Sequence, residues 1–598
     1  MSGANLSAVP VAQVAVRDGF WADRQQVYRE VTLPHCLAEL ESTGRLANFR
    51  RAAGQEPGGF QGRYGFDDSD VYKVLEGIAY VLMTGPSPAL AARADEMFRL
   101  IAAAQEPDGY LFTRSTLSPE RTRWSDMNSH EMYTGGHFIE AAVAYHQATG
   151  SAVALDTARR LADHYRTEFG PGRRHWVDGH EEVGLALMRL ADETGDEGYA
   201  DFAQWHLEER GRGHGRGAVW DDPAFGAAYS QDRIPVADLR AAEGHAVRLM
   251  YLMSGMTDAA VRGHEAYAPA LRALWDNVVQ HHLYVTGGIG AAGGIEGFGA
   301  PDALPNREAY CETCAAIALV LWADRMNRWT GDASAADVIE QVLYNGLLAG
   351  WSQSGDRFFY DNPLESDGSH RRQPWFGCAC CPSNLARFLP SVGRYVYAIG
   401  GDTVYVNQFI SSDARLAVGG QPVHVAQRTG FPWAGRVTLQ LAGDNLAHVQ
   451  LAIRKPAWAA SATVTVNGAP VPVRWARGYL VCERVWQTGD EVAVEFPLPA
   501  RRVHASPAVV ANRGSVALAR GPLVYAVEGA DNPGGVEHAA CPPSALLLAD
   551  PLAEVAGLGL TVRVRAIGPN AEAALTAIPY FLWANRDPGP MRVWLPEL

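Results

Sequence analysis

The chain has 598 residues, of which 47% are hydrophobic, 20% charged and 10% aromatic, a composition typical of globular proteins. Its net charge of −15 is spread along the sequence, and no basic stripe is present that could neutralise phosphates, which argues against nucleic-acid binding. No run approaches the roughly eighteen apolar residues that a membrane-spanning helix needs, so we expect no membrane span.

The N-terminal segment, residues 1–20, lacks both the basic start and the unbroken apolar stretch of a secretory signal. We therefore expect a cytoplasmic protein, in a compartment where thiols stay reduced. Disulfides are then not expected, and clustered cysteines indicate metal binding or catalysis instead.

Residues 27–399 read as a succession of about twelve amphipathic helices, because apolar residues recur at spacings of three and four. Between residues 155 and 169, for example, such residues form one apolar stripe, and a helix that ends in Gly150 precedes it. Further segments with this period are 70–84, 88–104, 180–194, 197–210, 240–254, 258–282, 308–327, 334–349 and 382–397.

A Thr-Gly pair separates two predicted helices at three places: Thr149-Gly150, Thr194-Gly195 and Thr330-Gly331. This is a weak repeat of helical hairpins, spaced by about 45 residues or a multiple of that length. Six hairpins can close into an (α/α)6 barrel, while an open solenoid or an irregular helical domain are the alternatives. The long non-helical insertions at 211–238 and 284–307 favour a barrel whose loops build a cleft.

After about residue 400 the period of hydrophobicity changes to two, which indicates strands. Asn467-Gly468 is a strong signal for a two-residue hairpin turn. We therefore expect a multidomain protein, mainly α and then β: a helical barrel over 1–400, a β-sandwich over 401–515 and a second β-sandwich over 516–598, whose last strand is a candidate to pair with the first sandwich. The strand-like segments begin at Thr403, Arg436, Val449, Thr463 and Glu491.

Five of the eight cysteines lie in two short clusters, Cys311-Glu312-Thr313-Cys314 and Cys378-Ala379-Cys380-Cys381. Zinc suits such ligands, and two arrangements are open. Spacing alone favours a closed structural site of four thiolates, Cys311, Cys314, Cys378 and Cys381. The other arrangement uses Glu312 and the adjacent pair Cys380-Cys381, which makes sense if one thiolate faces a cleft.

Several neighbouring residues favour a cleft. Glu296 lies in a glycine-rich stretch, residues 287–297, of the kind that brings side chains to a site. His130, His180 and His245 each open a predicted helical segment, and helix starts at one end of a barrel converge on its mouth. Tyr360 lies in the aromatic segment 358–363.

The sequence resembles glycoside hydrolase family 127, whose members are bacterial enzymes typified by β-L-arabinofuranosidase. The resemblance runs from about residue 15 to the C-terminus. The segments that carry it are Gly377-Cys-Ala-Cys-Cys-Pro-Ser-Asn384, Glu312-Thr-Cys314, Ser129-His-Glu-Met-Tyr133, Phe66-Asp-Asp-Ser-Asp-Val-Tyr-Lys73, Arg520-Gly-Pro-Leu-Val-Tyr525 and Trp583-Ala-Asn585.

The resemblance implies an (α/α)6 barrel catalytic domain followed by β-sandwich domains, and a possible homodimer. It implies a zinc ion, Zn2+, held by Glu312, Cys314, Cys380 and Cys381. It further implies Cys380 as nucleophile, Glu296 as general acid/base, and a sugar surrounded by His130, His180, His245 and Tyr360. Cys311 then becomes a bystander and Cys378 a motif residue that is not a ligand, while the Gly- and Pro-rich stretch 298–302 departs from the family pattern and bears on substrate choice.

These expectations describe a retaining exo-glycosidase that acts on a small β-L-arabinofuranoside or related furanoside. Zinc would keep Cys380 as a thiolate, and Glu296 would first protonate the leaving oxygen and then deprotonate water. One competing hypothesis is a polysaccharide lyase or sugar epimerase on the same barrel with a purely structural zinc. Another is a carbohydrate-binding protein without catalysis.

Overall fold

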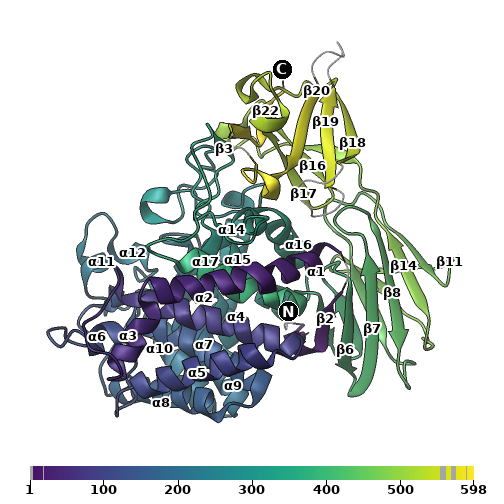
Figure 1. Cartoon of the computed structure of the whole chain (residues 1–598). Helices are drawn as coiled ribbons and strands as arrows, with labels where there is room; N and C mark the ends of the chain where they lie inside the picture. The colour runs from purple at the N-terminus through teal and green to yellow at the C-terminus, as the bar shows by residue number, and fades with distance from the viewer. Residues whose placement is uncertain (1–3, 18, 553–560, 568–573, 587–588, 598) are drawn as a thin grey trace.

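The computed structural model describes residues 4–17, 19–552, 561–567, 574–586 and 589–597. A helical N-terminal domain, in purple to teal in Figure 1, is followed by β-rich domains in green and yellow. Among the described residues, no helix is both long and apolar enough to cross a membrane.

Six helices of the N-terminal domain pack side by side in a closed ring, in which each contacts the next and the last returns to the first. In ring order they are α4 (Asp68–Thr84), α7 (Glu131–Thr149), α9 (Glu182–Thr194), α13 (Ala246–Val261), α15 (Thr313–Thr330) and α17 (Cys380–Phe388). A second layer packs outside them: α2 (Leu33–Ser42), α5 (Pro88–Ala104), α8 (Ala152–Glu168), α10 (Glu197–Glu209), α14 (Ala268–His281) and α16 (Ala333–Val342). The remaining helices are α1 (Phe20–Val27), α3 (Arg45–Ala52), α6 (Thr113–Thr116), α11 (Ala218–Asp221) and α12 (Gly226–Tyr229).

The Thr-Gly pairs end inner helices, as the sequence predicts. Gly150, Gly195 and Gly331 follow α7, α9 and α15 with φ of 75°, 71° and 66°, a left-handed conformation that glycine adopts without strain. Each turn leads to the next outer helix. The predicted segment 240–254 begins later, because α13 starts only after Gly244 and the cap residue His245. The segment 382–397 is shorter, because α17 ends at Phe388, shortly before Pro390, and continues as a 3-10 turn.

Two sheets form the sandwich that follows the helices. The first has the order β1 (Ser7–Ala8), β4 (Tyr397–Gly400), β5 (Thr403–Val406), β9 (Gln450–Arg454), β13 (Tyr479–Cys482), β12 (Arg474–Ala476). The second has the order β11 (Ala469–Pro470), β10 (Thr463–Val466), β14 (Glu491–Glu495), β8 (Arg436–Ala442), β7 (Gln421–Thr429), β6 (Ser412–Val418), β2 (Val14–Val16). Their alternating apolar residues share one core.

Two details of this sandwich bear on the sequence predictions. The turn at Asn467-Gly468 is confirmed, since both residues have positive φ and join β10 to β11. The N-terminal residues, assigned above to the helical region, instead supply β1 and β2, because each pairs with an edge strand of a sheet.

The C-terminal region builds a third sheet in the order β15 (Ala500–Val503), β16 (Ser515–Arg520), β17 (Leu523–Glu528), β20 (Ala574–Pro579), β19 (Thr561–Ile567), β18 (Leu546–Leu552). The expected boundary at 515/516 thus falls inside β16, in a sheet that already contains β15. The last strand, β22 (Trp594–Pro596), pairs with β16 and not with the first sandwich. On one face, Ala517, Val524 and Ala526 pack against loops of the helical domain.

This third sheet braces a loop of the helical domain, residues 351–378. Strand β3 (Glu365–Ser366) of the loop pairs with β21 (Met591–Arg592), which in turn pairs with β17. The ring of Phe359 stacks on that of Trp583, with centroids 5.0 Å apart. Arg372 donates to the carbonyl oxygens of Ala349 and Trp583, each at 2.8 Å. The loop that carries Tyr360 is therefore held from the C-terminal side.

Arg454 joins the helical domain to the sandwich. Its side chain is fully buried and pairs with Asp337 at 2.5 Å and with Glu340, both on α16. Its Nε also donates to the carbonyl oxygen of Asn407 at 2.6 Å. Burial raises the pKa of Asp337 to about 6, against the effect of Arg454, which lowers it. The two carboxylates depend on this one cation for their charge balance.

We predict that Arg454→Met lowers the free energy of unfolding by about 3–5 kcal/mol, because it removes the cation that pairs with the buried Glu340 and the half-buried Asp337. The control is Arg474→Met, which breaks a pair with Glu483 whose side chains are 57% and 51% exposed, and it should cost about 0–1 kcal/mol. Denaturant unfolding of both variants is the measurement. Equal losses of unfolding free energy in the two variants would show that Arg454 contributes no more to stability than an exposed ion pair does.

Candidate functional site

A cavity of about 230 Å³ opens at the N-terminal ends of the inner helices. Each of these helices contributes at or just before its first turn. Phe66 precedes α4, His130 and His245 are the N-cap residues of α7 and α13, His180 precedes α9, Glu312 caps α15, and Cys380 begins α17. The positive ends of several helix dipoles therefore converge here, which favours anionic groups such as thiolates and carboxylates.

The three candidate sugar-binding histidines line this cavity as neutral imidazoles. Burial lowers the pKa of each, and the nearby Arg248 lowers it further; the pKa of His130 falls to about 3. Nδ1 of His130 lies 2.6 Å from the carbonyl oxygen of Asn128, to which it donates, so Nε2 is left as an acceptor. The backbone of His130 is left-handed, with φ of 66°, a strained conformation that concentrates at functional sites.

Glu296 is held by two hydrogen bonds. The backbone N–H of Val247 donates to Nδ1 of His245, so the His245 proton is on Nε2, which donates to Oε2 of Glu296 at 3.1 Å. The hydroxyl of Tyr310 donates to Oε1 at 2.6 Å. Burial raises the pKa of Glu296, but these donors outweigh it and the net pKa is lowered. Like His130, Glu296 has a left-handed backbone, with φ of 49°.

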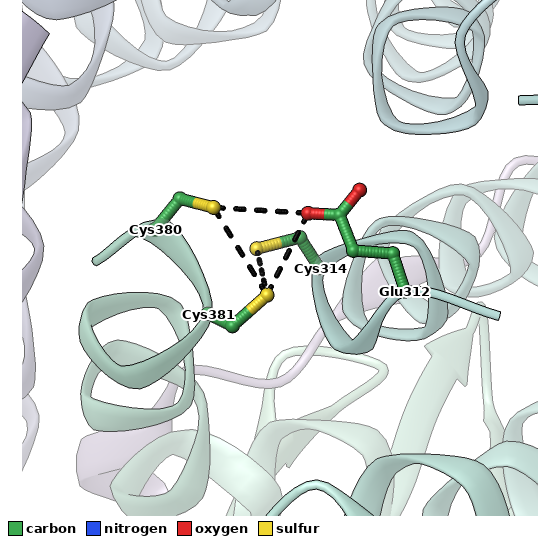
Figure 2. A group of neighbouring side chains, drawn as sticks. All are labelled: Glu312, Cys314, Cys380 and Cys381. Carbon is green, nitrogen blue, oxygen red and sulfur yellow. Dashed lines mark hydrogen bonds between the residues drawn. The ribbon is translucent and has the colours of Figure 1, made fainter. Parts of the chain in front are cut away.

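Glu312, Cys314, Cys380 and Cys381 form one compact group, although two sequence segments supply it (Figure 2). Sγ of Cys314 lies 3.3 Å from Sγ of Cys381, which lies 4.0 Å from Sγ of Cys380. Oε1 of Glu312 lies 3.7 Å from Sγ of Cys380 and 3.6 Å from Sγ of Cys381. Around a tetrahedral zinc with Zn–S bonds of about 2.3 Å and a Zn–O bond of about 2.0–2.2 Å, two sulfurs would lie about 3.8 Å apart and a sulfur and the oxygen about 3.6 Å apart, so these spacings suit such an ion.

The protonation of this group also fits a metal. Burial and the neighbouring thiol of Cys380 raise the pKa of Glu312 well above its ordinary value, and Oε2 of Glu312 is buried without a hydrogen-bond partner. Burial also raises the pKa of Cys381. A cation would relieve the crowding of negative charge and supply a partner for the carboxylate.

The other two clustered cysteines do not belong to this group of potential metal ligands. Cys311 is buried in a second apolar core, beside Gly288, and does not belong to the potential metal ligands. Cys378 lines the cavity, with Sγ 3.8 Å from that of Cys380. The four-thiolate arrangement that spacing favours is therefore not the group that the fold assembles.

Tyr360 faces Cys380. Its hydroxyl lies 3.0 Å from Sγ of Cys380 and 3.6 Å from Sγ of Cys378. Burial raises the pKa of Tyr360 well above its ordinary value, so the phenol keeps its proton and is able to donate it to a thiolate. The N–H of Thr313, at the start of α15, donates to the carbonyl oxygen of Tyr360 at 2.9 Å and ties the aromatic loop to the ligand cluster.

The motif segment Phe66–Lys73 holds the cysteine turn in place. Asp70 accepts from Ser383 at 2.8 Å and from Nε of Arg45 at 2.8 Å, and Arg45 also donates to the carbonyl oxygen of Gly377 at 3.1 Å. Lys73 donates to the hydroxyl of Tyr133 at 2.8 Å beneath the cavity. The residues around Asp70 therefore position the first turn of α17.

Several cavity residues were not among the predicted site residues: Tyr64, Phe66, Tyr133, Tyr229, Val247, Arg248, Tyr251, Cys378 and Asn384. Tyr310, which does not line the cavity, was not predicted either, although it binds Glu296 directly. Its only signal in the sequence is its position two residues before Glu312. Tyr229 lies in the long insertion between α10 and α13, where no periodicity marks individual residues.

Three family models match consecutive parts of the chain. They describe a β-L-arabinofuranosidase GH127 catalytic domain at residues 13–394, a GH127 middle domain at 403–498, and a glycoside hydrolase family 127 C-terminal domain at 500–596. Together they cover nearly the whole sequence.

Individual relatives give the same result. The chain is 38% identical to a non-reducing end β-L-arabinofuranosidase of Bifidobacterium longum, over 93% of each chain. The crystal structure of a GH127 β-L-arabinofuranosidase from Geobacillus stearothermophilus is 38% identical, with a TM-score of 0.93 over 98% of this chain and 100% of that one. A GH127 β-arabinofuranosidase structure is 40% identical, with a TM-score of 0.92 over 100% of this chain and 98% of that one.

Proposed function

The chain belongs to glycoside hydrolase family 127, and from this premise we propose that it is a retaining β-L-arabinofuranosidase that removes single sugar units from a small oligosaccharide or glycoside. The observation that carries the proposal is the shared cavity of Glu296 and Cys380, a hydrogen-bonded carboxyl group and a thiol in one small space. We further propose that the closed helical ring with its outer layer is an (α/α)6 barrel, which its six inner and six outer helices support.

The cavity supports action on a terminal sugar. Its volume of about 230 Å³ is below the roughly 300–1,000 Å³ of pockets that enclose drug-sized ligands. One furanose ring fits such a space, whereas a continuous polysaccharide chain does not. Neutral histidines and tyrosine hydroxyls on its walls can donate to and accept from sugar hydroxyls.

We propose that Glu312, Cys314, Cys380 and Cys381 hold one zinc ion. When bound, zinc would keep the coordinating thiols deprotonated and fix the direction of the Cys380 sulfur. The compact donor set and the unpartnered oxygen of Glu312 support this assignment. Tyr360 then donates its hydroxyl proton to the Cys380 sulfur as a hydrogen bond, which orients the nucleophile toward the sugar.

In the first step, the Cys380 sulfur forms a bond to the anomeric carbon while the bond from that carbon to the leaving oxygen breaks. Glu296 supplies the proton that the leaving oxygen needs. In the second step Glu296 removes a proton from water, whose oxygen displaces the sulfur and frees Cys380. Two displacements at one carbon retain its configuration.

A screen of nitrophenyl furanosides and pyranosides tests the substrate. β-L-Arabinofuranoside should be cleaved fastest, with the β-anomer of L-arabinose as the first product seen by NMR. The α-anomer as first product would contradict retention. An unsaturated product that absorbs in the ultraviolet would instead indicate a lyase.

The metal prediction distinguishes Cys314, a proposed zinc ligand, from Cys311, which is not one. Purified protein should carry about one zinc per chain, because one four-ligand site is present. Cys314→Ser should lose the metal and lower the melting temperature, while the matched control Cys311→Ala should keep it. Zinc is measured by mass spectrometry of the elements. Loss of zinc from Cys311→Ala as well as from Cys314→Ser would restore the four-thiolate arrangement.

The prediction for Glu296→Gln concerns the leaving group. With a sugar aglycone, activity should fall by about 10²–10⁴-fold, because the variant cannot protonate the leaving oxygen. With a nitrophenyl aglycone the first step should partly survive, and mass spectrometry should find one sugar on Cys380. The exposed Glu308→Gln serves as the control and should behave like the parent. Equal losses on both substrates without an adduct would remove Glu296 from the acid/base role.

The prediction for Tyr310→Phe concerns pH. The Tyr310 hydroxyl lowers the pKa of Glu296, so its removal raises that pKa. An acid is active only while protonated, and a higher pKa keeps it protonated to higher pH. The alkaline limb of kcat/KM should therefore move to higher pH. The control is Tyr284→Phe, which removes a hydroxyl that donates to the Pro305 carbonyl oxygen and should leave the alkaline limb unchanged. If the alkaline limb of Tyr310→Phe does not move either, Tyr310 does not influence the pKa of the catalytic acid.

A further inference from the structure

A second group of potential metal ligands lies outside the cavity, at His175, Glu209 and His214. Nδ1 of His175 lies 2.6 Å from Oε2 of Glu209, and Nε2 of His214 lies 3.2 Å from the same oxygen. All three ligand atoms lie within 4.8 Å of one another. None of these residues takes part in the reaction proposed above.

The arrangement places two imidazoles on one carboxylate oxygen. Their rings are stacked, with centroids 4.6 Å apart and planes inclined by 13°. Without a metal, each facing nitrogen carries a proton and donates it to Glu209. A neutral imidazole can move its proton to the other ring nitrogen, and both facing nitrogens then present lone pairs. The same three groups thereby become two nitrogen ligands and one oxygen ligand.

This donor set selects a class of metal. Imidazole with carboxylate suits zinc, nickel, cobalt and copper, whereas magnesium and calcium prefer oxygen ligands alone. Around a tetrahedral zinc with bonds of about 2.0–2.2 Å, the three ligand atoms would lie about 3.3 Å apart, which requires changes of about an ångström here. The side chains of His175 and His214 are 50% and 31% exposed and can turn, while that of Glu209 is only 10% exposed and is held in place.

The three residues come from three segments that meet beside the cavity. Glu209 ends α10, His175 lies in the loop before α9 that also carries His180, and His214 lies in the insertion that carries Tyr229. Arg210 already links the same segments, since it pairs with Glu181 at 3.0 Å and donates to the carbonyl oxygens of Asp178 and Ser230. A metal ion bound here would add a second link between α10 and the two segments that carry His180 and Tyr229.

We propose that His175, Glu209 and His214 form a second, exchangeable binding site for a transition-metal ion such as Zn²⁺ or Ni²⁺. Three protein ligands leave one position for water, which the exposure of His175 allows. With fewer protein ligands than the cysteine group, this site releases its ion more readily. Its occupancy stabilises the loops of His180 and Tyr229 against α10. The proposal does not depend on the glycosidase mechanism, because it concerns binding and stability alone.

The test is calorimetric titration of the full-length protein, as purified, with NiCl2 and separately with ZnCl2. The parent should bind one more ion per chain than the double variant His175→Gln/His214→Gln. The single variant His214→Gln should bind that ion at least about tenfold more weakly, because one of three ligands is lost. Saturating Ni²⁺ should also raise the melting temperature of the parent and not of the double variant.

A matched control is His146→Gln. His146 forms a similar histidine–carboxylate pair with Glu193, but no second histidine joins it. This variant should bind the additional ion as the parent does. Equal stoichiometry in the parent and the double variant would overturn the site, and so would an equal loss in His146→Gln. Melting temperatures without added metal show that each variant is folded, so a missing ion cannot be attributed to unfolding.

Discussion

The packing of α17 against α4, which closes the ring of inner helices, is the constraint on which the site depends. Closure places the start of α17 beside the start of α15, so Cys381 meets Cys314 from 67 positions away in the sequence. It also brings the first turns of the inner helices to one cavity. An open row of the same hairpins would leave α17 far from α4, and the Asp70–Ser383 hydrogen bond that positions the cysteine turn could not form.

Charge balance around the cavity follows from this arrangement. Thiols and carboxyl groups gather at converging helix starts, whose partial positive charge favours their anionic forms. Burial, and to a lesser extent the cation of Arg248 on one side, keeps the neighbouring histidines neutral. Beneath the cavity, Arg387 pairs with Glu76 and Glu140, and also donates to the hydroxyl of Tyr251. Buried charges of both signs therefore lie around the site.

None of the described residues of the β-rich domains lines the cavity, yet these domains determine part of its shape. Through Trp583 and strand β21, the third sheet holds the loop that presents Tyr360 to Cys380. Asn345 of the helical domain adds a reciprocal pair of bonds, because it donates to the carbonyl oxygen of Pro522 and accepts from the N–H of Val524. The two C-terminal motif segments, Arg520–Tyr525 and Trp583–Asn585, therefore make contacts with the helical domain.

The sequence by itself determined the order of helices and strands, the turns at Gly150, Gly195 and Gly331, and the candidate residues of both cysteine clusters. These features depend on local periodicity, on backbone conformations that favour glycine, and on residue types with few roles. Only the tertiary structure decided that Cys311 lies outside the ligand group, that Tyr310 binds Glu296, and that the N-terminal strands join the sandwich. Each of these facts is a distance between segments remote in the sequence or a side-chain direction, and both are set by how helices and sheets pack, which local periodicity does not encode.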